Sequence, residues 1–589
     1  MVVVVLVLGS TNTTDAQKKH NTTSQKILNM DQQKLMIYQL LPRLFGNSHT
    51  QNIAYGTIAQ NGSGKFNDIT GKALDGLLEL GATHVWYTGV IAHASLTDYS
   101  AFGIKTDDAD VVKGRAGSPY AIRDYYDVDP DLAVDVNNRM AEFEALLQRT
   151  HQKGMKVIID FVPNHVSRGY KSLLKPANVI DFGAQDDVNK AFSPTNDFYY
   201  VPGKALVVPP NTDTITTFLT PLQDRKFQEY PAKATGNNVF SEMPKVDDWY
   251  ETIKLNYGVD YSAGEKNYFS PMPPVWGKMK AILMYWADKG VDGFRCDMAE
   301  MVPVEFWNWV IPEIKKVHPN MVFIGEAYNP KVYETYLNEG KFDYLYDKVG
   351  LYDGLKKLIR NEADADVNEI TKAWQAERQS YPNKMLHFLE NHDEERIASA
   401  GFAGDPALAL PAMVVSATLS GGPVMLYFGQ EVGEPAIGKE GFGGDDNRST
   451  IFDYWGIPEH QKWMNKGAFD GALLSPDQVQ LRDFYKKLMH IAATAPAIRH
   501  GEIFEIPHTG NMNNRMYGYI RYTAKQRLLI VVNFDRSHVM DVEIVIPEQL
   551  LNGLNSVKAK SLLGSAAVNT QGKMINVSLK PVSAQIIEF

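Results

Sequence analysis

Short apolar runs alternate with amphipathic stretches between about residue 36 and residue 431. Runs of this length predict buried strands, whereas the stretches between them repeat apolar residues every three or four positions, as helices do. Eight runs are predicted strands: 36–42, 83–90, 156–162, 293–297, 322–326, 344–347, 385–391 and 424–428. The clearest helical stretches are 140–153, 278–289, 304–317 and 407–419. Eight strand–helix units close a (β/α)8 barrel, so the pattern predicts an α/β protein built on a TIM barrel.

Two regions depart from this alternation. Residues 167–274, after the third strand, are rich in Pro, Asn, Asp and Tyr, and they are too long for a simple loop, which predicts an inserted domain. From residue 500 to residue 589 the helical period is lost, and alternating runs such as 516–522 and 528–533 predict a C-terminal antiparallel β-sandwich. The barrel itself is therefore expected to comprise residues 31–166 and 275–499.

The start of the chain is apolar. Residues 1–8 read Met-Val-Val-Val-Val-Leu-Val-Leu, and a polar stretch follows to residue 29. This run is far too short to span a bilayer, so we expect no transmembrane segment there. Residues 1–30 predict a signal peptide or a disordered N-terminus, although no basic residue precedes the apolar run. We expect a periplasmic or secreted protein, with a cytoplasmic location as the alternative.

Composition and charge exclude some partners. The 589 residues carry a formal net charge of -10, and the sequence pI is about 5.8. Because the charges are dispersed and no basic patch stands out, we expect no nucleic-acid partner. Cys296 is the only cysteine, which excludes intramolecular disulfides. Neither observation indicates an oligomeric state.

Two predicted strands end in a carboxylate. They are residues 293–297 (Gly-Phe-Arg-Cys-Asp) and 324–326 (Ile-Gly-Glu). Side chains two residues apart in a strand point the same way, so Arg295 and Asp297 are expected to share one face. In a barrel of this kind, the carboxyl ends of the strands carry catalysis. Two carboxyl groups about 5 Å apart are what retaining cleavage of a glycosidic bond requires.

Four motifs stand in order at predicted strand ends: 160–165 (Asp-Phe-Val-Pro-Asn-His), 293–297, 325–327 (Gly-Glu-Ala) and 388–393 (Phe-Leu-Glu-Asn-His-Asp). With them the chain resembles the α-amylase family of retaining glycoside hydrolases over nearly its whole length. Residues 120–130 and 422–431 are similar to the loops of the second and eighth barrel strands in that family.

The resemblance implies roles for individual residues. Asp297 would be the nucleophile, Glu326 the general acid and base, and Asp393 a third carboxylate that holds the sugar hydroxyls. The implied substrate-binding residues are Tyr120, which would stack beneath the sugar, His165 and His392 as hydroxyl donors, Arg295, which would lower the pKa of Asp297, and Arg396, which would support the site. For each of these residues, a structural role in packing or ion pairing is the competing interpretation.

The resemblance requires no cofactor for the chemistry. In many relatives the residue matching Asn164 binds calcium between the barrel and the inserted domain, so Asn164 is the candidate ligand of a structural calcium ion. A hydrogen bond without metal is the alternative for this asparagine.

The residues after Asp297 bear on specificity. Glu300 and Met301 stand where α-amylases acting on long starch chains commonly have lysine and histidine. The resemblance therefore extends to neopullulanase-like and cyclomaltodextrinase-like members. We expect retaining hydrolysis of α-1,4-glucosidic bonds, with α-1,6 bonds as further targets, in starch, pullulan, cyclodextrins or maltooligosaccharides. The alternatives are an α-glucan transglycosylase on the same scaffold and an inactive glycan-binding barrel.

Overall fold

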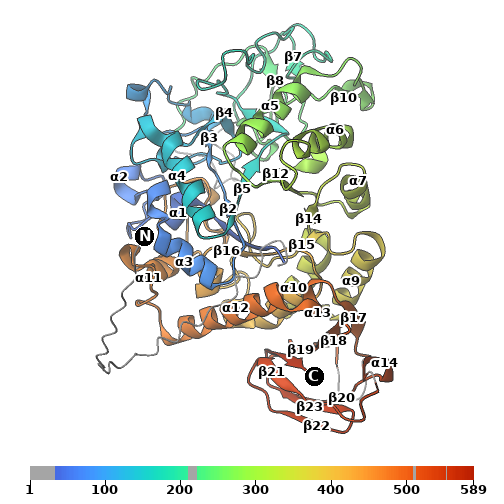
Figure 1. The fold of residues 1–589 in the computed structure, drawn as a ribbon. Helices are drawn as coiled ribbons and strands as arrows, with labels where there is room; N and C mark the ends of the chain where they lie inside the picture. The colour runs from blue at the N-terminus through green and yellow to red at the C-terminus, as the bar shows by residue number, and fades with distance from the viewer. Residues whose placement is uncertain (1–33, 210–221, 508–512, 552) are drawn as a thin grey trace, which may run out of the picture.

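The computed structural model describes residues 34–209, 222–507, 513–551 and 553–589 (Figure 1). The predicted signal segment at 1–30 lies outside these residues. Eight parallel strands form one sheet in the order β15-β14-β13-β12-β5-β2-β1-β16. Their bounds are β1 Met36–Leu40, β2 His84–Tyr87, β5 Lys156–Phe161, β12 Gly293–Cys296, β13 Val322–Gly325, β14 Tyr344–Tyr346, β15 Met385–Leu386 and β16 Val424–Tyr427. All eight predicted strands are present, and the predicted fold class is confirmed.

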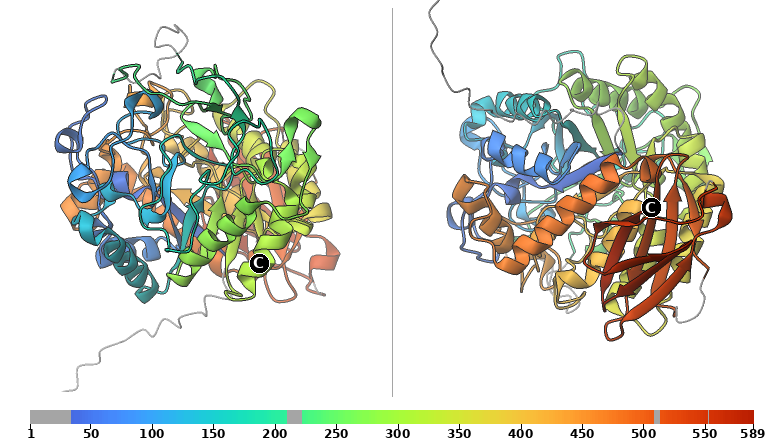
Figure 2. Two further views of the ribbon diagram at one scale, coloured as in Figure 1. Left: turned by 90° about the horizontal axis from the view of Figure 1, so that it is seen from above. Right: turned by 60° about the horizontal axis from the view of Figure 1, so that its bottom comes forward.

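The sheet curls into a nearly closed ring, which Figure 2 shows from two further directions. β1 pairs with β16 on one side and with β2 on the other. A single parallel bridge between His387 and Val424 joins β15 to β16. Apolar side chains that point into the ring fill its interior, among them Ile37, Trp86, Ile158, Ile324, Leu386 and Met425. The ring is therefore a packed core whose only accessible chemistry lies at its rim.

Helices cover the outside of the ring because each presents an apolar face to it. In α5 (Pro274–Asp288) the residues Met279, Leu283 and Trp286 are fully buried, at the spacing of one helix face. The other helices of eight or more residues are α3 Gly71–Glu79, α4 Arg139–Gln152, α6 Val304–Lys315, α8 Asp353–Arg360, α9 Asn368–Ser380, α10 Leu410–Thr418 and α12 Pro476–Thr494. Shorter helices are α1 Pro42–Phe45, α2 Ile58–Asn61, α7 Tyr333–Asn338, α11 Pro458–Met464, α13 Pro496–Arg499 and α14 Glu548–Leu551.

Between β2 and α4, strands β3 (Ile91–His93) and β4 (Ile122–Val128) form an antiparallel pair. Between β5 and α5 the described chain forms three small antiparallel pairs. The first joins β6 (His165–Ser167) to β9 (Thr252–Lys254). The other two join β7 (Tyr200–Val201) to β8 (Ala232–Lys233) and β10 (Val259–Asp260) to β11 (Lys266–Asn267). The β6–β9 pair brings the end of the insertion back to the barrel rim beside His165.

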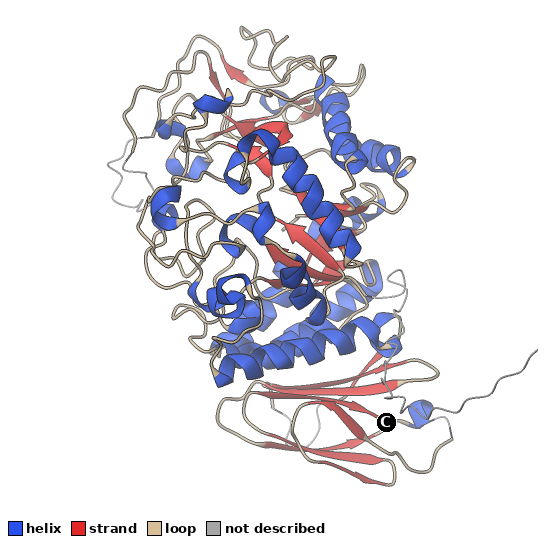
Figure 3. Cartoon of the chain, turned by 60° about the vertical axis from the view of Figure 1, so that its left-hand side comes forward, coloured by secondary structure: helices blue, strands red, loops and turns tan. Residues whose placement is uncertain are grey.

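The C-terminal region consists of two antiparallel sheets that lie below the barrel in Figures 1 and 3. One contains β17 Glu502–Glu505, β18 Met516–Tyr522, β19 Arg527–Asn533, β24 Ser583–Glu588 and β21 Lys560–Leu563. The other contains β20 Met540–Val545, β23 Met574–Leu579 and β22 Val568–Gln571. Residues of both sheets share one apolar cluster, which is the core of a sandwich.

Arg521 joins this sandwich to the barrel. Its guanidinium donates hydrogen bonds to the main-chain carbonyls of Leu419, Ala497, Ile498 and Gly501. In the described part of the chain, no helix combines the length and the apolar content that a membrane span needs.

Candidate active site

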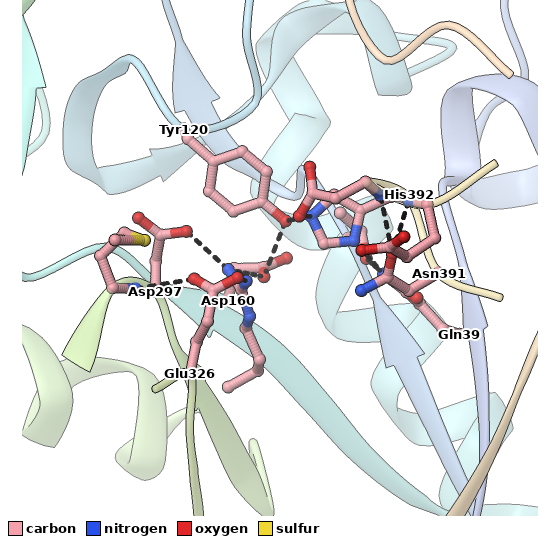
Figure 4. A network of polar contacts seen from close by, with 12 residues as sticks. Gln39, Tyr120, Asp160, Asp297, Glu326, Asn391 and His392 are labelled. Carbon is pink, nitrogen blue, oxygen red and sulfur yellow. Dashed lines mark hydrogen bonds and ion pairs between the residues drawn. The ribbon is translucent and has the colours of Figure 1, made fainter. Parts of the chain in front are cut away.

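A buried polar network that includes Asp160, Asp297, Glu326 and His392 lies at the carboxyl ends of the barrel strands (Figure 4). Arg295 joins three of its carboxylates. Its Nη1 is 2.7 Å from Asp297 Oδ1, and its Nη2 is 2.6 Å from Glu326 Oε1. Asp160 Oδ1 lies 3.6 Å from Nη1. One guanidinium therefore holds two carboxylates within a few ångströms of each other and a third beside them.

The strand register explains this convergence. The peptide N–H of Asp297 donates to Phe161 O, and the N–H of Glu326 donates to Cys296 O, so both carboxylates leave neighbouring strands at one level. Arg295 and Asp297 point the same way, as the period of a strand predicts. Met298, whose φ of 42° is left-handed, turns its N–H toward Glu326 Oε2 at 2.8 Å. The backbone thus fixes the positions of the Asp297 and Glu326 side chains.

Burial and charge act in opposite directions on these acids. Burial raises the pKa of Asp297 well above its ordinary value, although the neighbouring Arg295 lowers it. The prediction that Arg295 lowers this pKa is correct as a contribution, but burial is the larger effect. Burial also raises the pKa of Asp393, but interactions with His392, Arg295 and Arg448 outweigh burial and bring it to about 2.

On the opposite side of the network, His392 joins three groups. Its Nε2 lies 2.5 Å from the Tyr120 hydroxyl and 3.1 Å from Asp393 Oδ2. Its Nδ1 lies 2.8 Å from the amide nitrogen of Gln39, and because that nitrogen donates, the ring proton belongs on Nε2. Tyr120 stacks on His392 with ring centroids 5.2 Å apart, and its hydroxyl donates to Asp160. Gln39 therefore orients the histidine, and the histidine orients Asp393.

A cavity of about 260 Å³ opens onto these groups. Five of the predicted site residues line it: Tyr120, His165, Asp297, Glu326 and Asp393. The other lining residues include Lys113, Ser118, Trp249, Glu251, Met298, Tyr328, Ile451 and Phe452. His165 is buried beside Trp249, and burial lowers its pKa to about 3, so its ring is neutral under working conditions.

Two predicted substrate-binding arginines do not line the cavity. Arg295 is completely buried beneath the carboxylates and lies over the rings of Trp86, Tyr120 and Tyr346. Arg396 is also completely buried, where it pairs with Glu390 at 3.0 Å and donates to Phe428 O. The expectation that they bind substrate directly is corrected, because both guanidiniums form ion pairs with buried carboxylates of the protein. They position other groups.

The surroundings of Asn164 do not suit calcium. Its Oδ1 accepts a hydrogen bond from the Lys254 ammonium at 2.5 Å, and its main-chain carbonyl accepts from the N–H of Leu255. Lys254 also lies 3.3 Å from Met301 O. Lys254 therefore engages the Asn164 oxygen that a calcium ion would need. Burial lowers the pKa of Lys254 to about 7, and both its charged and its neutral form can donate to that oxygen.

Several residues at the site were not found from the sequence. Tyr328, whose hydroxyl donates to Glu326 Oε1 at 2.6 Å, follows Glu326 by two positions, and the two-residue period could have revealed it. Gln39 lies in the first predicted strand, where its polar side chain in an apolar run was a usable signal. Lys113 and Glu251 come from irregular segments, which carry no comparable signal.

Comparison with known proteins identifies a family and several relatives. The family described as "Alpha amylase, catalytic domain" matches residues 39–456. Alpha-amylase 3 of Dictyoglomus thermophilum is 24% identical over 493 residues, covering 80% of this chain and 82% of that protein. Neopullulanase 2 of Thermoactinomyces vulgaris is 22% identical over 572 residues, covering 94% and 77%. The acarbose-soaked crystal structure of the Nostoc punctiforme debranching enzyme superposes with a TM-score of 0.61 at 20% identity, covering 94% of this chain and 98% of that one.

Proposed function

The chain belongs to the α-amylase family of glycoside hydrolases, and from this premise we propose that it hydrolyses α-1,4-glucosidic bonds with retention of configuration. The observation that carries the proposal is the sharing of one guanidinium by Asp297 and Glu326, at 2.7 Å and 2.6 Å. A carboxylate pair held by one guanidinium is compatible with the covalent route, whose two carboxyl groups are about 5 Å apart.

Asp297 is the proposed nucleophile. Arg295 occupies its Oδ1, which leaves Oδ2 to attack the anomeric carbon and form a glycosyl ester. Glu326 donates a proton to the departing glycosidic oxygen and later takes one from water. The N–H of Met298 and the hydroxyl of Tyr328 hold its two oxygens in place for both steps.

Asp393 is the proposed partner of the sugar ring. With a pKa of about 2 it is anionic throughout the working range, so it can accept hydrogen bonds from ring hydroxyls and stabilise positive charge at the transition state. His165 lines the cavity beside it, His392 holds Asp393 in place from behind, and the Tyr120 ring provides an apolar face.

The substrate class we propose is α-glucan: starch, pullulan, cyclodextrins and maltooligosaccharides, with α-1,6 bonds as additional targets. A time course with maltoheptaose tests this. We expect the first product to be the α-anomer by proton NMR, and Asp297→Asn should reduce turnover by roughly 10⁴-fold or more. Asp364→Asn, an exposed aspartate paired with Lys357, is the matched control. A β-anomer as first product, or full activity of Asp297→Asn, would contradict the mechanism.

A further inference from the structure

The cavity is walled on one side by an ion pair between two segments far apart in the sequence. Lys113 Nζ lies 2.7 Å from Glu251 Oε1, and their side chains are only 14% and 4% exposed. Lys113 belongs to the connection between β2 and β5, whereas Glu251 directly precedes β9 in the insertion. Both residues line the same cavity as Asp297 and Glu326.

The order of strands around the ring places this wall relative to the reacting bond. Glu326 follows β13, and the strand four places away in either direction is β1, flanked by β2 and β16. Lys113 lies in the connection after β2, and Phe452 lies in the connection after β16. Lys113 and Phe452 therefore follow strands that lie across the mouth from Glu326, and Glu251, from the insertion after β5, joins them through its ion pair with Lys113.

The general acid marks the leaving-group side. Glu326 protonates the oxygen that departs with the rest of the chain, so the sugar units on the other side of the broken bond extend away from Glu326. That direction leads toward Lys113, Glu251 and Phe452. The part of the substrate that forms the covalent ester therefore has its non-reducing end at this wall.

The wall is rigid. The N–H groups of Ala116 and Gly117 donate to Phe452 O, and the N–H of Arg115 donates to Asp453 Oδ1. On the insertion side, Glu251 O accepts from the N–H of Arg168 at 3.1 Å. Three segments of the rim are thus tied together, and substrate cannot push them apart without breaking buried hydrogen bonds.

The wall also carries unused polar capacity. Glu251 Oε2 is buried and makes no hydrogen bond within the described residues. This is an unfavourable state, which a ligand hydroxyl would relieve once the Glu251 side chain turns toward the cavity. The Lys113 ammonium has three donors, and Glu251 takes one of them. A carboxylate oxygen and an ammonium side by side suit the vicinal hydroxyls of a terminal glucose.

Resting on the proposed function, we propose that Lys113 and Glu251 close the cavity against longer glucan chains and bind the hydroxyls of the non-reducing terminal glucose. The enzyme then acts from chain ends and releases products of one or two glucose units. This narrows the proposed substrates to α-glucans with a free non-reducing end, and cyclodextrins, which have none, are no longer among them. The cavity volume of about 260 Å³ agrees, since it is below the roughly 300–1,000 Å³ of pockets that bury a drug-sized ligand.

Two 4-nitrophenyl maltoheptaosides test the inference, one with a free non-reducing end and one whose terminal 4- and 6-hydroxyls are blocked by an ethylidene group. We expect the wild type to cleave the blocked substrate at least tenfold more slowly, and to release glucose or maltose from the free one. Lys113→Met keeps the aliphatic stem but removes the charge. It should raise the ratio of the cleavage rate of the blocked substrate to that of the free substrate by at least tenfold, and it should lengthen the products.

Glu251→Gln, which preserves size, is the second variant in case Lys113→Met folds poorly. Lys372→Met is the matched control, because Lys372 is 71% exposed and pairs with Glu369 on the outside of the barrel. Equal cleavage of both substrates by the wild type would overturn the inference and leave the proposed function intact. An unchanged ratio in both variants would overturn it too. Failure to cleave either substrate would contradict the proposed function itself, and this inference with it.

Discussion

The hydroxyl of Tyr328 donates a hydrogen bond to Glu326 Oε1 across 2.6 Å. Tyr328 lines the cavity, so this bond is made at the surface where the leaving group must pass. The same carboxylate oxygen lies beside Nη2 of Arg295. Tyr328 therefore positions the proposed acid from the substrate side, while Arg295 holds it from below.

Tyr328→Phe should slow cleavage of maltooligosaccharides by up to about tenfold, because the carboxyl group that must deliver the proton loses a positioning hydrogen bond of about 0.5–1.5 kcal/mol. Maltosyl fluoride, whose leaving group needs no proton, should show little loss. Comparing kcat/KM on the two substrates checks this. Tyr333→Phe is the control, since the Tyr333 hydroxyl is buried without a hydrogen-bond partner among the described residues. Equal losses on both substrates would show that Tyr328 does not act through the acid.

Arg295→Gln should move the acid limb of the pH–activity profile to higher pH. Burial already raises the pKa of Asp297, and Arg295 is the group that opposes this rise. Without the guanidinium, the nucleophile stays protonated to a higher pH and less enzyme is active in acid. The measurement is kcat/KM of maltosyl fluoride against pH. An acid limb that stays in place while the rate falls would assign Arg295 a purely structural role.

Chelation should leave stability unchanged. Lys254 Nζ donates hydrogen bonds to Asn164 Oδ1 and to Met301 O, so the junction of barrel and insertion needs no calcium. We expect the thermal midpoint in EDTA to equal that in calcium. Lys254→Met should lower it by a few degrees, because Asn164 Oδ1 then loses its donor in a buried position. A midpoint that falls in EDTA and recovers with calcium would contradict this account.

Stability should fall as the pH rises from 5 to 8, and Glu440 is one cause. Burial raises its pKa to about 8, so the folded protein keeps this proton while the unfolded chain loses it near pH 4.5. The stability that this proton contributes is fully present below the pKa of Glu440 in the unfolded chain. It is lost as the pH rises through the pKa of about 8 in the folded protein.

At about 1.4 kcal/mol per pKa unit, the shift from 4.5 to about 8 makes the loss from this group on the order of 5 kcal/mol. Glu440→Gln removes the titration, so its thermal midpoint should match the wild type near pH 5 and exceed it by a few degrees near pH 8.5. Glu548→Gln, whose side chain is 76% exposed, is the control. Parallel pH profiles for wild type and Glu440→Gln would refute the assignment.

Most of the barrel could be predicted because parallel strands buried on both faces are nearly continuous apolar runs. The last two runs illustrate the limit. β16 follows its prediction closely, but the run at 385–391 yields only the two residues of β15. Beyond it the chain leaves the ladder because Glu390 turns to accept hydrogen bonds from Arg396 and from the N–H of Ile397. Such tertiary competition cannot be read from periodicity.

The site divides in the same way. The period of a strand aligned Arg295 with Asp297, but it gave no measure of burial, which decides the direction of the Asp297 pKa. Lys113 and Glu251 meet only because the insertion folds back along β6, so their contact depends on the whole fold. The sequence therefore reveals the acidic residues of the site. It reveals neither how deeply they are buried nor the long-range contact between Lys113 and Glu251.

The pairing of β1 with β16 has a consequence for how the chain matures. Met36 finds its partner only at Val424, so the ring stays open until both have left the ribosome. At roughly 5–20 residues per second, synthesis of the intervening segment takes on the order of 20–80 s. Throughout that interval the nascent polypeptide exposes one edge of a growing parallel sheet to any neighbouring strand. Because the ring closes last, the nascent chain must avoid aggregation through this open edge during translation. Chaperones would act on the chain at this stage.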